Sequence, residues 1–470
     1  MKRFLTVLLL LLALVMVACT AGGQPPDNAN EPATDVPADN ANEEPVVTEE
    51  PMVTEEPMGG EIYLMGADGL LSATFFDNVG EDALGMYFSG PGQPADNAAY
   101  QEFVTKYTDT FGEAPIQAFH ARAYDAANMV FNAIEQVAEV ADDGTITIDR
   151  GALIEAMYQM EHEGLTGTLS CNRYGDCASP VIDILRFEDL AAGVTGVLSN
   201  VKRTFAFEAS QAGVGELPDA PAEDLGQVVI EAGAPIEIAT LQAISGAVSN
   251  LGTDQVRAVE IAIEDRGGTL LDHPLELSLE ADDLCSAEGG TTGAQQIIAN
   301  PQIVAVIGTS CSGAGVPAAE ALSGAGVLII SGSNTSPSLT ATGYFSEEGP
   351  TQAEAWAYGY FRTSHNDEFQ GRAAAQFAQE ELGVTTAATI NDGDPYTQGL
   401  TGAFAGSFTE FGGEVALETA VGKDQEDMRP VLTEVAASGA GILFFPIFEP
   451  AGNNIVLQVR DVGLMPISDM

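Results

Sequence analysis

Two short apolar runs that end in hydroxyl-rich loops constrain the fold of this chain more than any other feature. The runs are Val304–Ile307 and Val327–Ile330, and helical spacing over Val316–Ala325 separates them. A strand, a helix and a second strand in this order predict a parallel α/β sheet. Small hydroxyl and glycine residues follow each run, first over 309–313 and then over 333–336.

The position of these two loops suggests a ligand site. In open parallel sheets, ligands bind beyond the carboxyl ends of the strands. Hydroxyl groups and free backbone N–H groups at helix N-termini suit a carboxylate at such a place. The alternative is that these are ordinary turn and helix-capping residues, and one loop alone does not decide between the two interpretations.

The first nineteen residues predict export. Lys2 and Arg3 precede an apolar run over Phe4–Val17, and small residues lead from it to Cys19. The run is short for a membrane-spanning helix and is typical of a signal peptide. A cysteine directly after the cleavage site predicts lipidation of Cys19, with the protein held at the outer face of the cytoplasmic membrane or in the periplasm. A secreted protein with an incidental cysteine is the alternative.

An acidic, proline-rich segment over residues 20–60 is predicted to be a disordered tether. It contains the tandem repeat VTEEPMVTEEPM at Val47–Met58 and no Lys or Arg, so it cannot bury enough apolar surface to fold. Most of the 69 acidic residues lie beyond it, and the formal net charge is −53. This charge argues against binding to nucleic acid or to anionic lipid.

Four further cysteines, an even number in an exported chain, predict disulfides. Cys171 and Cys177 flank a turn and are expected to pair locally. Cys285 and Cys311 follow two strands that we expect to be adjacent. No metal or cofactor site is predicted, because the cysteine spacings are not those of zinc sites and the four histidines are scattered. These histidines are His120, His162, His273 and His365.

Regular alternation of strands and helices is confined to the second half of the chain. Residues 61–210 contain helices and isolated strands without a complete strand–helix–strand series, and 211–233 reads as a linker. From 234 to 470 the alternation is regular, with a first lobe at about 234–345 and part of a second lobe at about 350–470. The second part is expected to begin with a helix over Thr351–Phe361.

The loop region resembles that of the branched-chain amino-acid binding proteins of ABC importers, the Leu/Ile/Val-binding family. The residues that carry this resemblance are Cys311-Ser312 after one strand and Ser333-Asn334-Thr335-Ser336-Pro337 after the next. The resemblance implies a two-lobed α/β fold of the periplasmic binding protein type I class. In this fold each lobe is a mostly parallel sheet flanked by helices, and the ligand cleft lies between the lobes. It also implies a disulfide between Cys285 and Cys311.

The order of the segments differs from that of the family. Family members run through a Val-Gly-Leu motif into a strand and a Gly-Ala-Asp-Gly-like loop, but here these motifs stand at 462–464 and 66–69. We therefore expect a circular permutant, in which 234–470 followed by 60–210 forms one protein. The joining strand would then be split between Met465–Ile467 and Ile62–Met65. The alternative is a fusion of two half-copies, each incomplete or completed by another molecule.

The resemblance also implies which residues hold the ligand. Hydroxyl and backbone donors would bind the α-carboxylate, and Asp68 would pair with the α-ammonium. A tyrosine and Phe448, which stands where the family often has tyrosine, would close over the ligand. The full set is Ser312, Ser333, Asn334, Thr335, Tyr396, Phe448 and Asp68. The ordinary alternatives are a turn aspartate at Asp68, a helix N-terminus at Tyr396 and core packing at Phe448.

These features imply a lipid-anchored solute-binding protein that captures a branched-chain or related amino acid, or a similar small zwitterion. Its partner would be an ABC permease in the membrane, and it would act as a monomer. We expect no enzymatic activity, because the chain has no GxSxG, HExxH or P-loop motif. An amino-acid or amide sensor of the same fold is one alternative, and a rearranged half-fusion without binding activity is another.

Overall fold

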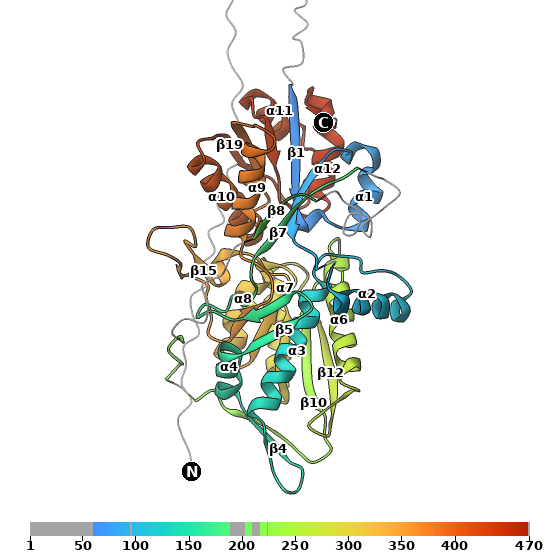
Figure 1. Ribbon diagram of the computed structural model, residues 1–470, viewed down its shortest axis with the longest axis vertical. Helices are drawn as coiled ribbons and strands as arrows, with labels where there is room; N and C mark the ends of the chain where they lie inside the picture. Colours follow the sequence, from blue (N-terminus) through green and yellow to red (C-terminus); the bar gives the residue numbers. More distant parts are fainter. Residues whose placement is uncertain (1–59, 95, 189–202, 209–216, 223, 469–470) are drawn as a thin grey trace, which may run out of the picture. The chain divides into compact units, whose positions relative to one another are not determined.

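The structure is a computed structural model that describes residues 60–468 except 95, 189–202, 209–216 and 223. The expected signal peptide, Cys19 and most of the tether therefore lie outside the described residues. The described chain forms two lobes, each built on a mostly parallel sheet with helices packed against it (Figure 1). Among the described residues, no helix combines the length and the apolar character needed to cross a bilayer.

The sheet of the first lobe has six strands among the described residues, in the order β11-β12-β10-β13-β14-β17. Neighbouring strands are parallel except at the β11–β12 edge. Its strands are β10 (Ile236–Gln242), β11 (Thr269–Leu270), β12 (His273–Asp282), β13 (Ile303–Gly308), β14 (Leu328–Ser331) and β17 (Tyr360–Arg362). Its helices are α2 (Ala98–Phe111), α3 (His120–Val137), α4 (Arg150–Gln159), α6 (Ser249–Asp265), α7 (Ala287–Ile298) and α8 (Ser312–Gly324).

The core of the first lobe combines both halves of the sequence. Helix α3 buries Met129, Val130 and Ile134 in the same apolar core as Ile238 and Ile330 of the sheet. These α3 residues fall on one helical stripe, which explains why this helix can cover a sheet encoded more than a hundred residues later. Short strands complete the lobe: β3 (Glu139–Val140), β4 (Ile146–Asp149), β9 (Gln227–Ile230), β5 (Glu161–Gly164) and β6 (Gly167–Ser170).

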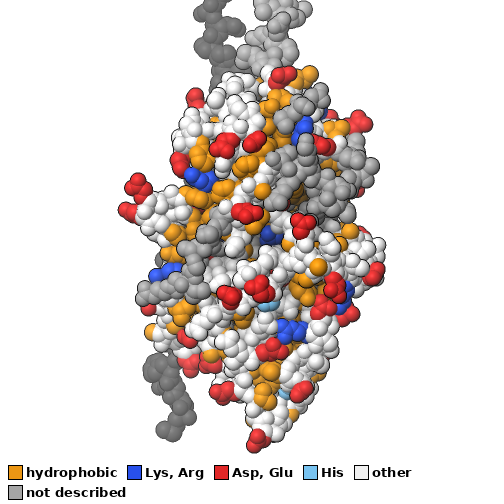
Figure 2. Space-filling view, in the orientation of Figure 1, with side chains coloured by type: hydrophobic (Ala, Val, Ile, Leu, Met, Phe, Trp, Pro, Cys, Tyr) orange, Lys and Arg blue, Asp and Glu red, His pale blue; other side chains and the backbone are white. Residues whose placement is uncertain are grey.

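The sheet of the second lobe follows the order β19-β18-β20-β1-β2-β7-β8, with β21 also paired to β1. Its strands are β1 (Glu61–Ala67), β2 (Tyr87–Pro91), β7 (Val181–Arg186), β8 (Arg203–Glu208), β18 (Thr386–Asn391), β19 (Glu414–Ala420), β20 (Ile442–Phe444) and β21 (Met465–Pro466). Its helices include α1 (Ala73–Val79), α9 (Asp367–Glu380), α10 (Pro395–Glu410), α11 (Arg429–Ser438) and α12 (Ala451–Gln458). Acidic side chains are scattered over the face seen in Figure 2, with few basic ones between them.

Strand β1 joins the two ends of the sequence in one sheet. Its residues 63–65 pair in parallel with 442–444 of β20, and its residues 65–67 pair in parallel with 87–89 of β2. Figure 1 shows this blue strand among the orange and red elements of the second lobe. Described residues from both 60–210 and 234–470 therefore lie in one sheet.

The structure corrects the expected joining strand. Residues 465–466 do not continue into β1 but lie beside it, in parallel register with Glu61 and Ile62. The amide of Ile467 donates to the carbonyl oxygen of Ile62 at 3.0 Å. The two segments are therefore neighbouring strands, and the prediction of one strand split between them was wrong.

Three further expectations need correction. The helix predicted over Thr351–Phe361 is absent among the described residues, because β17 pairs 360–362 with β14 and the first lobe extends to Arg362. The predicted linker 211–233 contains β9, which pairs with β4. Strands β12 and β13 are not adjacent, because β10 lies between them.

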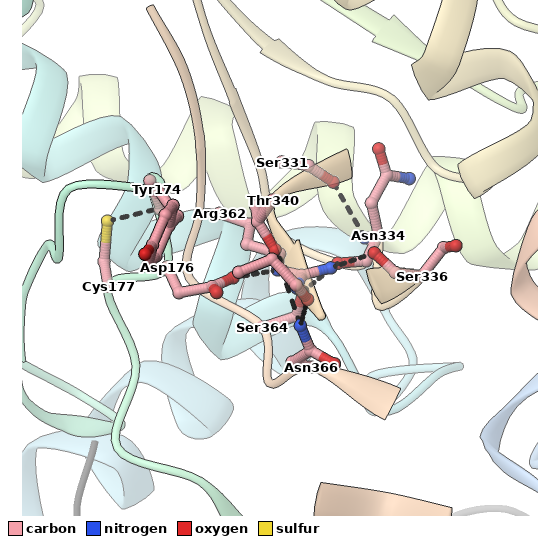
Figure 3. A network of polar contacts seen from close by, with 12 residues as sticks. Tyr174, Asp176, Cys177, Ser331, Asn334, Ser336, Thr340, Arg362, Ser364 and Asn366 are labelled. Atoms are coloured by element: carbon pink, nitrogen blue, oxygen red, sulfur yellow. Dashed lines mark hydrogen bonds and ion pairs between the residues drawn. The ribbon is translucent and has the colours of Figure 1, made fainter. Parts of the chain in front are cut away.

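A buried ion pair also ties the two halves of the sequence together. Arg362 at the end of β17 and Asp176 are both almost completely buried, and Arg362 Nε donates to Asp176 Oδ1 at 2.5 Å. The backbone joins in, since the amide of Arg362 donates to the carbonyl of Gly175 and the amide of Cys177 donates to that of Arg362. Figure 3 shows Asp176 beside Arg362, with Asn334, from the loop after β14, on the other side.

We predict that Asp176→Ala lowers the free energy of unfolding by about 3–5 kcal/mol, because it leaves the buried Arg362 guanidinium without its counter-ion. Urea denaturation of the purified protein measures this loss. Asp82→Ala is the matched control, since Asp82 pairs with Arg460 at an exposed site where ion pairs contribute little. Equal urea concentrations at the unfolding midpoint for the two variants would contradict the prediction.

Candidate functional site

The first wall of the site is formed by the loops that follow β13 and β14. Because these parallel strands are neighbours, their carboxyl ends bring the two loops together. Ser333 Oγ donates to the carbonyl of Ser310 at 2.8 Å and accepts from Gln255 Nε2 at 2.9 Å. The backbone amide of Ser310 donates to the buried carboxylate of Asp283 at 2.7 Å. The loops are thus held in place from behind, and Ser312 begins helix α8.

Thr335 and Asn334 differ in what their side chains can offer. Asn334 Nδ2 donates to the carbonyl of Thr309 at 3.0 Å, and Asn334 Oδ1 accepts from Thr309 Oγ1 at 3.0 Å. The Asn334 side chain therefore braces the loop. Thr335 Oγ1 is buried, and among the described residues it has no hydrogen-bond partner. Of these two candidates, Thr335 is the one whose side chain is not used within the loop, and its hydroxyl faces the Asp367 carboxylate.

Arg362 fixes the backbone on both sides of Thr335. Its Nη1 donates to the carbonyl of Ser336 at 2.8 Å and to that of Asn334 at 3.3 Å. The carbonyl of Thr335 itself accepts from the amide of Asp367 at 2.9 Å. Figure 3 shows how this side chain reaches the loop from β17. The position of Thr335 thus depends on the end of β17 and on the start of α9.

The second wall comes from the ends of β1 and β20 and the start of α10. Asp68 lies in the turn after β1, Tyr396 in the first turn of α10, and Phe448 after β20. The ring centroids of Tyr396 and Phe448 are 5.2 Å apart, and the amide of Gly69 donates to Tyr396 Oη at 3.4 Å. The first and second walls enclose one small cavity lined by Asp68, Gly69, Phe119, Leu251, Ser310, Cys311, Ser312, Ser333, Tyr396 and Phe448.

Two acidic side chains share this region. Asp68 is 4% exposed, and burial raises its pKa to about 6, although hydrogen bonds from Gln370 and Tyr396 oppose this rise. Burial and the nearby Asp68 charge raise the pKa of Asp367 well above its usual range. The Asp367 carboxylate is fully buried, and its contact with the Thr335 hydroxyl opposes the rise in its pKa. Two buried carboxylates with few partners make a site that favours a cation.

The structure brings five of the seven predicted ligand residues to one cavity, namely Asp68, Ser312, Ser333, Tyr396 and Phe448. Thr335 is not part of this lining, and the Asn334 side chain is used within the loop. Sequence reasoning missed Asp367 and Gln370, because N-D-E-F-Q-G reads as a capped helix start with first-turn acids. Phe119 also lines the cavity, but in the sequence it looks like one of the apolar residues of the helix that becomes α3.

Two disulfides flank the functional region. The structure joins Cys171 to Cys177 and Cys285 to Cys311. The second of these lies at the site, since Cys311 lines the cavity directly before Ser312. Within the described residues, no group of three or more His, Cys, Asp or Glu side chains is arranged to hold a metal ion.

Comparison with known proteins gives a family match in two pieces. The profile of a family described as periplasmic binding protein matches residues 63–176 and 235–468. An amino acid binding protein of Pseudomonas aeruginosa is 28% identical over 222 residues, which cover 47% of this chain and 56% of that protein. The Leu/Ile/Val-binding protein of Escherichia coli K12 is 25% identical over 232 residues, which cover 49% of this chain and 59% of that protein.

Solved structures with similar parts include a leucine binding protein from Thermotoga maritima, with 22% identity and a TM-score of 0.43 over 49% of this chain and 61% of that one. A solute binding protein of R. palustris in complex with benzoate gives 20% identity and a TM-score of 0.42 over 49% and 61%. In each of these curated relatives, the chain spans less than two thirds of the relative's length.

Proposed function

Because this chain belongs to the periplasmic binding protein family, we propose that it is an extracytoplasmic solute-binding protein that captures a free amino acid between its lobes. The ligand class is a branched-chain or related amino acid. The partner is an ABC permease that receives the ligand. Lipid at Cys19 anchors the protein to the outer face of the membrane, and the protein acts as a monomer.

One observation carries this proposal: Asp68 lines one wall of a cavity, and the hydroxyl groups of Ser312 and Ser333 line the opposite wall. Asp367 and Thr335 lie outside this lining, and Asp367 lies close enough to Asp68 for their charges to interact. Asp68 and Asp367 supply negative charge for the α-ammonium. The Thr335 hydroxyl and the donors near Ser312 at the start of α8 suit the α-carboxylate. A zwitterion loses its water when the lobes close, so both of its charges need such partners.

The apolar part of the lining supports an apolar ligand side chain. Phe119, Leu251 and Phe448 line the cavity together with Cys311. Names of relatives agree with this chemistry, since the Escherichia coli relative is a Leu/Ile/Val-binding protein. Apolar side chains gain by leaving water for such a surface.

The two matched segments also support circular permutation of the family's order. They meet in one sheet at β1, which lies between β20 and β2. We propose that 235–468 followed by 63–176 corresponds to one binding protein, whose cleft needs Asp68 from the early segment and Ser312 from the late one.

A thermal-shift screen of amino acids, amides and small carboxylates tests the proposed function. A true ligand at about 100 times its Kd should raise the unfolding free energy by about 2.7 kcal/mol. Asp68→Ala should then weaken binding by about 2–5 kcal/mol, because the ammonium loses its buried partner. Asp82→Ala, at an exposed site, is the control. A screen in which no amino acid shifts the transition would refute the proposal.

Affinity should also depend on pH. The ammonium pairs with ionised Asp68, so a proton on this carboxylate competes with the ligand. Since burial raises the pKa of Asp68 to about 6, affinity should rise as pH increases through this value. Binding at pH 5 should be about tenfold weaker than at pH 7. Calorimetry at a series of pH values measures this dependence, and Asp68→Asn should make the affinity nearly independent of pH. The same dependence of affinity on pH in wild type and Asp68→Asn would count against this role of Asp68.

Mass spectrometry of the non-reduced protein, purified from membranes, tests the anchor and the disulfides together. We predict an N-terminal peptide that begins at a lipid-modified Cys19, and peptides that link Cys171 to Cys177 and Cys285 to Cys311. Cys19→Ser should appear in the soluble fraction. An unmodified Cys19 would rule out the lipid anchor, and four free thiols would rule out both disulfides.

A further inference from the structure

Gln370 links the acidic wall of the cavity to the segment that crosses between the lobes. This side chain is fully buried on α9, and its Nε2 donates to Asp68 Oδ1 at 2.6 Å. The same NH₂ group lies 3.0 Å from Ser89 Oγ and 3.1 Å from the carbonyl oxygen of Ser89. On the other side, Gln370 Oε1 lies 2.5 Å from Nε2 of the buried His365.

The carbonyl of Ser89 determines how the Gln370 amide is oriented. A carbonyl oxygen only accepts hydrogen bonds, so it must face the NH₂ group of the amide. Oε1 of Gln370 then faces His365, which must donate through Nε2–H. Burial lowers the pKa of His365 to about 3, so the ring is neutral and carries this single proton on Nε2. His365 Nδ1 has no hydrogen-bond partner among the described residues.

We propose that His365 and Gln370 are positioning residues for recognition of the ligand's ammonium group. His365 holds the Gln370 amide in one orientation, and this amide holds the Asp68 carboxylate in place at the cavity. This inference rests on the proposed function, in which Asp68 is the ammonium partner. It adds two residues that do not line the cavity and whose spacing from Asp68 in the sequence gives no sign of the contact.

The alternative orientation of the amide is unfavourable for a simple reason. If Gln370 turned over, its oxygen would face two acceptors, Asp68 and the Ser89 carbonyl, in a buried place. The hydrogen bond from His365 to Oε1 favours the observed orientation. Without His365, Oε1 would be buried without a partner, and the observed orientation would lose this advantage. The chain His365–Gln370–Asp68 thus has only one arrangement in which every contact pairs a donor with an acceptor.

The same contact sets how readily Asp68 ionises. The groups around Asp68 are Gln370 on α9, Tyr396 on α10, Asp367 at the start of α9 and Arg122 on α3. Among the influences that lower its pKa, the Gln370 hydrogen bond is the largest and the Arg122 charge is a smaller one. Removing the Gln370 donor should therefore raise the pKa of Asp68 further and favour its protonated form, which does not pair with an ammonium.

The test compares variants by the pH at which amino-acid affinity falls to half its plateau value. Gln370→Leu should move this midpoint up by about one pH unit and weaken binding at pH 6 by about fivefold. His365→Leu should act in the same direction. His365→Gln should return the midpoint toward that of wild type, because the glutamine NH₂ can take the place of the histidine Nε2–H.

His273→Leu is the matched control for loss of a buried histidine. His273 contacts the carbonyls of Ala234 and Gly144 in the first lobe, away from the cavity. This variant should lower the melting temperature without moving the pH midpoint. An unchanged midpoint in Gln370→Leu, or an equal movement in His273→Leu, would overturn the inference.

Carbon-13 NMR of labelled aspartate carboxyls gives a readout that needs no ligand. The Asp68 signal is assigned from its loss in Asp68→Asn, and its titration should move to higher pH in Gln370→Leu and His365→Leu. If wild-type protein binds no amino acid, the proposed function fails, and this titration still decides whether the two residues control Asp68.

Discussion

The hydrogen bonding of β1 between β20 and β2 is the interaction on which the rest of this structure depends. It places a strand from the beginning of the folded chain at the centre of a sheet whose other half comes from the end. Without it, β20 would present an unpaired edge and the second lobe would lose the turn that contains Asp68. The pairing therefore completes a core through Ile62 and Leu64, and it positions Asp68 and Gly69, in the turn that follows, at the cavity.

The cavity follows from this pairing through a few buried polar contacts. The turn after β1 brings Asp68 to Gln370 of α9, and Arg362 holds the carbonyls on either side of Thr335. Both arrangements join segments that are distant in the sequence. Buried acids such as Asp68 and Asp367 are costly when they lack partners, and a cationic ligand would relieve that cost. The acidic wall is thus understandable as a feature of binding, whereas it would be unfavourable for stability alone.

The sequence predicted those parts of the molecule that depend on local patterns. The runs around 303–340 form β13, α8 and β14, and the hydroxyl-rich loops follow the strands as expected. Residues 351–361 contain good helix formers, but pairing with β14 draws 360–362 into the sheet, and no local pattern reveals such a partner. Asp367 and Gln370 look like ordinary helix residues, because their proximity to Asp68 depends on a turn about three hundred residues away in the sequence.

A crystal structure of the mature protein with a bound amino acid tests the central claim most directly, namely that both halves of the sequence build one binding site. The account predicts the ligand's ammonium group within hydrogen-bond distance of the Asp68 and Asp367 carboxylates, and its carboxylate beside Thr335 and the start of α8. A ligand that contacts only residues of 235–468, or that lies outside this cavity, would contradict it.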